Sequence, residues 1–253
     1  MSVLLPVLFF CVAWLYAMAG FGGGSTYIAL LAISGLPLAA VPVIALSCNL
    51  IVSGQGSIKL IKQGHARKDI LVPLLVGSIP AAFLGGAWRL PPSTFMVILA
   101  AGLSVAGIAM LLQSLLQKAA SKNEQAPRRW VLFAVGIVLG LLAGITGIGG
   151  GIYLAPVMHL LGWARAQTIA TCTSLFIALN SAAGLVGQLT KGVSPIESLP
   201  LAILIACPFA VLIGGRLGTH LLTSKLSQQR IRVITAAVIL LVAVRLWIKV
   251  LFS

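Results

Sequence analysis

The sequence has very few acidic residues and few charges of any kind. Three of its 253 residues are Asp or Glu and 8% are charged, whereas 60% are hydrophobic. A soluble chain of this size needs a charged surface, and several windows of about 19 residues carry no charge, as in membrane helices. The composition therefore excludes a soluble globular domain and predicts an all-α polytopic membrane protein.

The three acidic residues also avoid the apolar spans. Asp69, Glu124 and Glu197 all fall in loops or at the starts of spans. Asp69 and Glu197 are most simply first-turn residues, where the helix dipole favours a negative charge. Because no carboxylate lies clearly within a span, a proton relay or a carboxylate-lined cation path is poorly supported.

Motifs for catalysis, nucleotides and metals are missing as well. The sequence contains no H-E-x-x-H or G-x-S-x-G, and no Gly-Lys-Ser/Thr follows a glycine cluster. Neither an enzyme nor an ATP-driven pump is therefore predicted, and no cofactor or metal is expected. The cysteines lie in apolar runs without C-x-x-C spacing, which predicts small buried hydrophobes that form no disulfide: Cys11, Cys48, Cys172 and Cys207.

The charge that is present is mostly positive. Seventeen Lys and Arg give a net charge of +14, a balance that also occurs in nucleic-acid-binding domains. Here the basic residues cluster in short loops between apolar segments, as the positive-inside rule predicts. We therefore expect a lipid bilayer as the partner of this chain, and no nucleic acid.

Glycine is abundant and concentrated in two matching clusters. "AGFGGGSTY" (19–27) and "TGIGGGIY" (146–153) superimpose four glycines at a spacing of 127 residues. "KQGHARKDILVPLLVGSIPAAFLGG" (62–86) then overlies "TKGVSPIESLPLAILIACPFAVLIGG" (190–215) at a spacing of 128. The chain is therefore predicted to contain two membrane repeats, 1–120 and 130–253, joined by a polar cytoplasmic linker, 121–129.

Each repeat is predicted to start with an apolar stretch that the glycines interrupt, 3–35 and 130–162. Three uninterrupted spans follow, each near the 20 residues that a membrane crossing needs: 38–58, 70–88 and 94–116 in the first repeat, and 166–188, 198–215 and 231–251 in the second. The sequence leaves open whether each interrupted stretch is a broken helix that crosses or a hairpin that re-enters.

The loop charges distinguish parallel from inverted repeats. The loop at 59–69 carries four basic residues and its counterpart at 189–197 carries one. The loop at 89–93 carries one, and its counterpart between 216 and 232 carries four. Such an exchange is expected when two repeats cross the membrane in opposite directions. The predicted fold is thus two inverted repeats with both termini outside.

Transporters built from inverted repeats bind substrate near the midplane, where interrupted helices meet. A glycine cluster lets the backbone expose N–H groups, and the helix that restarts there points its positive dipole end at the break, which suits an anion. The alternative is that the glycines only permit close helix packing, but three consecutive glycines in both halves exceed that need.

The predicted anion site consists of the two glycine clusters and of polar residues beside them or in the following span. For any single Ser, Thr or Asn, hydrogen bonding between helices is an equally good interpretation. The predicted residues are Gly22, Gly23, Gly24, Ser25, Thr26, Ser47, Asn49, Gly149, Gly150, Gly151, Thr173, Ser174 and Asn180.

The order of "GFGGGSTY", "GITGIGGGIY", "TCTSLFIALNSAAG" and two Pro-to-Gly-Gly spans resembles the TauE/SafE family of membrane transporters, also known as the sulfite exporter or 4-toluene sulfonate uptake permease family. "GVSPIESLP" lacks the basic loop of "GHARKDIL", a departure that inversion explains. The resemblance implies transport of sulfur-containing anions such as sulfite, sulfonates or sulfoacetate across the bacterial cytoplasmic (inner) membrane.

We therefore expect a secondary transporter or uniporter that works by alternating access around the glycine breaks. Two alternatives are a channel-like anion pore and a non-transporting membrane accessory subunit. The sequence does not determine the anion, the direction of transport, the coupling ion or whether the chain forms a homo-oligomer.

Overall fold

The computed structural model describes residues 4–18, 20–37, 39–115, 126–191, 201–220 and 228–251. Within these ranges every regular element is a helix, which confirms the predicted all-α fold. The helices are α1 (Leu4–Met18), α2 (Gly24–Ile33), α3 (Ala40–Lys62), α4 (Lys68–Ala87), α5 (Pro92–Leu115), α6 (Arg129–Thr146), α7 (Gly151–Leu160), α8 (Ala166–Leu189), α9 (Leu201–His220) and α10 (Gln228–Leu251).

In the described ranges, six helices are long and apolar enough to cross a membrane: α3, α4, α5, α6, α8 and α9. The longer α10 contains a further apolar stretch, Ile239–Ile248. Large apolar side chains point outward from these helices, among them Leu84, Ile205 and Leu241. Exposed apolar side chains on helices of this length and composition are typical of contact with lipid. The chain is a multi-pass membrane protein, as predicted.

Both predicted glycine breaks are present. The first lies between α1 and α2, and the second lies between α6 and α7. Gly23 and Gly150 immediately precede α2 and α7 and have φ angles of 87° and 77°. This left-handed conformation is open to glycine but costs other residues energy, so the glycines end one helix and permit another to restart.

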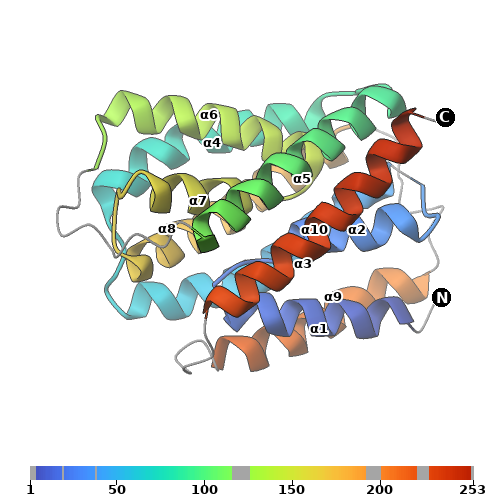
Figure 1. Cartoon of the computed structure of the whole chain (residues 1–253), viewed down its shortest axis with the longest axis horizontal. Coiled ribbons are helices and arrows are strands. Elements are labelled where there is room, and N and C mark those ends of the chain that lie inside the picture. The colour runs from blue at the N-terminus through green and yellow to red at the C-terminus, as the bar shows by residue number, and fades with distance from the viewer. Residues whose placement is uncertain are drawn as a thin grey trace.

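The chain reverses direction at the first break. The ring of Tyr27 stacks on that of Phe9 with centroids 4.6 Å apart, whereas a continuous helix would separate these residues by about 27 Å. In Figure 1, α2 returns toward the end from which α1 starts, and α7 returns toward the end from which α6 starts. Each interrupted stretch is therefore a re-entrant hairpin, one of the two forms that the sequence left open.

The long helices connect two ends of the molecule. The start of α1 and the end of α10 lie together at one end (right in Figure 1), which we call the terminal end. There Arg89 donates a hydrogen bond to the carbonyl of Lys191. The loop between α3 and α4 lies at the opposite end, because the 20 residues of α4 span about 30 Å.

Most described basic residues lie toward this opposite end, which we call the basic end. Lys59 donates a hydrogen bond of 2.5 Å to the carbonyl of Thr219 near the end of α9, and Lys68 and Arg129 line one groove there. The basic end carries Lys59, Lys62, Arg67, Lys68, Arg128, Arg129, Arg165 and Arg216. Outside the described residues are Lys118, Lys122, Glu124, Glu197, Lys225 and positions 121–125 of the predicted linker.

Asp69 lies in the first turn of α4, as predicted, and forms a 2.5 Å ion pair with Arg67. All four cysteines are unpaired. Cys48, Cys172 and Cys207 are buried as predicted, but the prediction is wrong for Cys11, which is exposed. An apolar run cannot show which face of α1 meets its neighbours and which face meets lipid.

The main helix pairs are α1 with α9, α4 with α6, α4 with α8, α3 with α8, and α5 with α10, and α3 also packs on α9. In the predicted repeats α1 corresponds to α6, and α4 corresponds to α9. Exchanging the repeats therefore converts the α1–α9 pair into the α6–α4 pair and the α4–α8 pair into the less extensive α9–α3 pair. It leaves the α3–α8 and α5–α10 pairs unchanged. The two closest pairs each join one helix from either repeat.

Glycine allows α4 and α6 to approach backbone to backbone. A Cβ at Gly140 or Gly144 would lie well under 3.0 Å from the carbonyl oxygens of Ser78 and Ala82. Small residues at such interfaces are a common basis of helix association in lipid, where apolar burial supplies little driving force.

We predict that Gly140→Ala destabilises the protein, because the added methyl meets backbone that cannot move aside. Overpacking of this kind costs about 1–3 kcal/mol. Gly54→Ala in α3 is the matched control, since nothing lies within 4 Å of its Cβ position, while both changes improve helix propensity alike. Thermal unfolding in detergent should show a lower midpoint for Gly140→Ala alone; equal midpoints would contradict the prediction.

Candidate functional site

The two glycine breaks meet between α3 and α8. A Cβ at Gly24 would lie 2.6 Å from the carbonyl oxygen of Ile148, which belongs to the second break. A Cβ at Gly22 would lie 3.1 Å from Ile177 of α8. The tips of the two re-entrant hairpins are thus in contact, and the starts of α2 and α7 are brought together.

Asn49 of α3 lies between the two tips and is completely buried. Its Nδ2 donates a hydrogen bond of 2.8 Å to the carbonyl of Ile148. A Cβ at Gly22 would be 2.5 Å from its Oδ1, and one at Gly149 would be 2.9 Å from its Nδ2. A single amide therefore contacts both breaks, which places the predicted residue Asn49 at their junction.

Several buried polar atoms near this junction have no hydrogen-bond partner among the described residues. They are Asn49 Oδ1, Thr173 Oγ1 and Ser181 Oγ. Each such group costs about 1–3 kcal/mol when it is left unsatisfied. The Ser and Thr hydroxyls can each donate a proton, so a bound oxyanion would satisfy them.

The helices that restart at the breaks present uncapped N-termini. Neither α2 nor α7 has a side-chain cap, and neither has an acidic residue in its first turn. The N–H groups and the positive dipole end of each helix therefore face the junction without a protein anion to neutralise them, an arrangement that favours a negatively charged ligand.

A small cavity of about 20 Å³ lies at the junction. It has room for roughly one water molecule. Glycines of the first break and Ser25 and Asn49 form its polar side, and the remaining walls are Tyr16, Phe21, Met110, Ile148, Ile152 and Ile177. The junction is therefore closed in this conformation.

The other predicted polar residues differ in how close they come to the junction. Thr173 approaches it, since its Cγ2 would lie 2.9 Å from a Cβ at Gly151. Thr26 shares a hydrogen bond of 2.5 Å with the hydroxyl of Tyr16, and Ser47 donates to the carbonyl of Val43 in its own helix.

Ser174 and Asn180 are committed to other contacts. Ser174 donates to the carbonyl of Ser53 at 3.1 Å and so links α8 to α3. Asn180 donates from Nδ2 to the carbonyl of Phe176 at 2.7 Å. Ser181, which the prediction leaves out, lies closer, because a Cβ at Gly149 would be 2.8 Å from its Oγ. The sequence indicates Ser181 as a site residue only through its position next to Asn180 in the same polar stretch.

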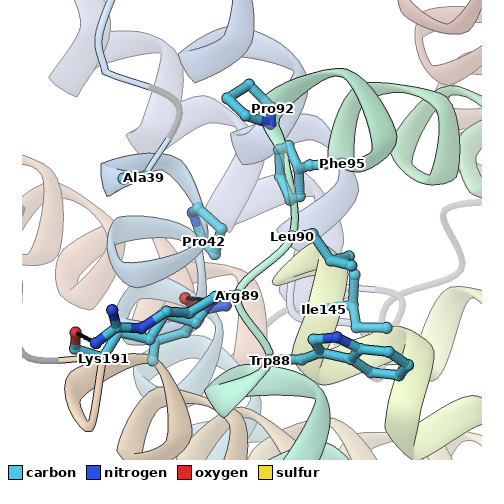
Figure 2. A pocket seen from close by; sticks show the side chains of 10 residues that line it. Ala39, Pro42, Trp88, Arg89, Leu90, Pro92, Phe95, Ile145 and Lys191 are labelled. Atoms are coloured by element: carbon cyan, nitrogen blue, oxygen red, sulfur yellow. Dashed lines mark hydrogen bonds between the residues drawn. The ribbon is translucent and has the colours of Figure 1, made fainter.

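A larger cavity, of about 240 Å³, lies at the terminal end. Its walls come from the start of α3, the α4–α5 connection, the start of α5 and the ends of α6 and α8 (Figure 2). The lining residues are Ala39, Pro42, Trp88, Arg89, Leu90, Pro92, Phe95, Ile145, Gln188 and Lys191. We call it the outer cavity.

Hydrogen bonds connect the outer cavity to the helix that leads into the second break. Lys191 Nζ donates to Gln188 Oε1 at 2.9 Å, and Gln188 Nε2 donates to the carbonyl of Gly144 at 3.0 Å. Gly144 is three residues before Gly147, where the break begins. In the sequence Arg89 and Lys191 are two separate loop charges, and only the folded chain shows that their loops meet.

Comparison with known proteins defines the family. The family model described as "Sulfite exporter TauE/SafE" matches residues 5–246. The chain belongs to the TauE/SafE family. A probable membrane transporter protein of Sinorhizobium fredii is 32% identical over 244 residues, which cover 96% of each chain. No solved structure gives a significant match.

Shorter matches link other transporters to this TauE/SafE protein. A probable membrane transporter protein of Methanocaldococcus jannaschii is 26% identical over 110 residues, 41% of this chain and 40% of that protein. One of Haemophilus influenzae is 44% identical over 52 residues, 21% and 19% of the two chains. The resemblance inferred from the motifs is confirmed, and the protein is a multi-pass transporter of the cytoplasmic membrane.

Proposed function

We propose that this TauE/SafE protein moves small sulfur-containing oxyanions, of the sulfite, sulfonate or sulfoacetate class, by alternating access around the two glycine breaks. The observation that carries the proposal is the convergence of two uncapped helix N-termini on the buried amide of Asn49. Unsatisfied hydroxyls of Thr173 and Ser181 add donors without adding charge. The sulfite named by the family model supports the choice of anion.

Alternating access is supported by the closed junction. A cavity of about 20 Å³ holds roughly one water molecule, so an oxyanion enters only after the surrounding helices move. The outer cavity lies at the terminal end, and Gln188 in its wall bonds to Gly144, three residues before the second break begins. A channel-like pore would instead need a continuous opening between the two ends.

Inverted repeats are supported by the directions of the helices and by their pairing. In Figure 1, α1 runs away from the terminal end and its counterpart α6 runs toward it. Exchange of the repeats also converts each main helix pair into itself or into another observed pair, with α4–α8 more extensive than its counterpart α3–α9. We assign the basic end to the cytoplasm on the positive-inside rule, which places both termini and the outer cavity outside.

Flux into proteoliposomes tests the transport proposal. A panel of sulfite, sulfate, thiosulfate, taurine and sulfoacetate should include at least one anion with saturable flux above that of protein-free liposomes. We expect turnover below about 10³ per second, since helix rearrangements take microseconds to milliseconds or longer. Far faster flux would indicate a channel-like pore, and no flux from folded protein would indicate an accessory subunit.

Cysteine labelling tests the proposed topology. In a cysteine-free background, a membrane-impermeant maleimide added to intact cells should label Lys191→Cys but not Arg67→Cys. Permeabilised cells serve as the control, in which both positions should react. Labelling of both positions from the same face of the membrane would contradict the inverted arrangement.

A further inference from the structure

The outer cavity contains two neighbouring cations and no carboxylate among its lining residues. Arg89 and Lys191 lie side by side on one wall (Figure 2). Among the described residues the one ion pair is Arg67–Asp69, at the opposite end of the molecule. Partial burial, together with the charge of Arg89, lowers the pKa of Lys191. In the described part of the chain no carboxylate compensates the positive charge of this cavity, and a bound anion would relieve it.

Hydrogen bonds hold both cationic groups in place. Arg89 donates to the carbonyl of Lys191, and the ammonium of Lys191 donates to Gln188, which is itself anchored on Gly144. Such anchoring reduces the side-chain entropy lost when a ligand binds. A guanidinium has five donors in a planar fork that matches the oxygens of a sulfonate or carboxylate, and one bond to a carbonyl leaves several of them available.

The remaining walls of the outer cavity are apolar. Trp88, Leu90 and Ile145 line the side facing the two cations, and Pro42 and Phe95 lie between these walls (Figure 2). The volume of 240 Å³ is twelve times the 20 Å³ at the junction. A bare inorganic ion would leave this apolar surface in contact with water, whereas an organic anion would cover it.

We propose that the outer cavity is a binding site for an organic anion, with Arg89 and Lys191 holding the anionic group and Trp88 covering the apolar body. It is separate from the junction of the glycine breaks and lies beside the helix that leads into the second break. The inference rests on the proposed anion transport for its biological purpose, but binding at the outer cavity is measured without flux.

Benzenesulfonate is a suitable probe because it combines one sulfonate with one apolar ring. Binding to the purified protein in an uncharged detergent, followed by tryptophan fluorescence and by calorimetry, should be saturable. Trp88→Phe should remove most of the fluorescence change while calorimetry still reports binding. We expect sulfite, which has no apolar body, to bind at least 10-fold more weakly than benzenesulfonate. Benzyl alcohol, which has no charge, should also bind at least 10-fold more weakly.

Substitution of the cations tests the assignment of their roles. Arg89→Gln and Lys191→Gln should each weaken benzenesulfonate binding at least 10-fold, whereas Lys191→Arg, which keeps the charge, should stay within about threefold of the original protein. Melting temperature and size-exclusion profile confirm that each variant is folded. Unchanged affinity in both folded Gln variants would overturn the proposal, as would undetectable binding to the original protein.

Two further experiments distinguish binding at the outer cavity from lipid binding and from binding at the junction. A lipid phosphate offers chemistry similar to that of a sulfonate. Benzenesulfonate binding is therefore measured again in nanodiscs of phosphatidylcholine with and without phosphatidylglycerol. If phosphatidylglycerol abolishes this binding, the cavity is a lipid site and the proposal is overturned. Asn49→Asp, which alters the junction, should leave benzenesulfonate affinity unchanged while flux falls. Loss of flux and loss of outer binding thus test the two proposals separately.

Discussion

Asn49→Asp should reduce the initial rate of oxyanion transport at least 100-fold, equivalent to about 2.7 kcal/mol. The substitution is nearly isosteric, but it replaces the donor that holds the carbonyl of Ile148 with a second acceptor. It also places a negative charge between two helix N-termini that we assign to an anion. Initial rates in proteoliposomes at neutral pH, at matched protein density, measure the effect.

The pH dependence of the same variant is a sharper test. Protonation of the introduced carboxyl removes its charge and restores a donor for Ile148, so its relative rate should rise as the pH is lowered. Ser47→Ala is the matched control, because this hydroxyl lies on the same helix and bonds only to Val43 within it. A rate for Asn49→Asp equal to that of Ser47→Ala would refute the role of the junction.

The double substitution Gly24→Ala with Gly151→Ala should lower transport below 1% of the original rate. A methyl at Gly24 overlaps the Asn49 amide, and one at Gly151 overlaps Ile177. Gly24 and Ile177 both line the cavity of about 20 Å³. The methyl at Gly24 therefore enters the place where the anion would bind, and the methyl at Gly151 pushes Ile177 against it. Flux of the substrate that is transported best measures the loss.

Misfolding must be separated from obstruction in that experiment. Gly54→Ala, which meets no atom within 4 Å, controls for the chemistry of the substitution. Benzenesulfonate binding at the outer cavity reports whether the fold persists around the altered junction. Near-normal flux in a double variant that still binds benzenesulfonate would show that the substrate passes elsewhere.

The architecture follows closely from the sequence, because apolar length and local glycine chemistry determine it. Six expected spans coincide with α3, α4, α5, α8, α9 and α10 over their described parts, and both glycine breaks fall where the clusters lie. The reversal at each break was not predictable, since it depends on contacts such as Phe9 with Tyr27. Helical periodicity in the sequence does not specify which turn of one helix packs against which turn of the next helix.

The site was predictable only in part, for a related reason. Glycine runs and Asn49 are distinctive in an apolar chain, and they do lie together at the junction. Hydroxyl residues are ambiguous as signals of a binding site. Ser47 forms its hydrogen bond within its own helix, and Ser174 forms one that links two helices. The outer cavity was missed since Arg89 and Lys191 are about a hundred residues apart in sequence, and only the folded helices bring their loops together.

The crossed pairing of α1 with α9 and of α4 with α6 has a consequence for any attempt to divide the protein. Residues 1–120 alone would expose the α4 surface that receives Gly140 and Gly144, and residues 130–253 alone would expose the glycines of α9 that fit against Phe10 and Trp14. Each fragment alone leaves helix surfaces unpacked that the other fragment covers in the whole protein. Fragments that are co-expressed should therefore accumulate in the membrane, whereas either fragment expressed alone should be degraded. Under the proposed inversion, an ancestor encoding one repeat would, by the same packing, have needed a second copy inserted in the opposite orientation.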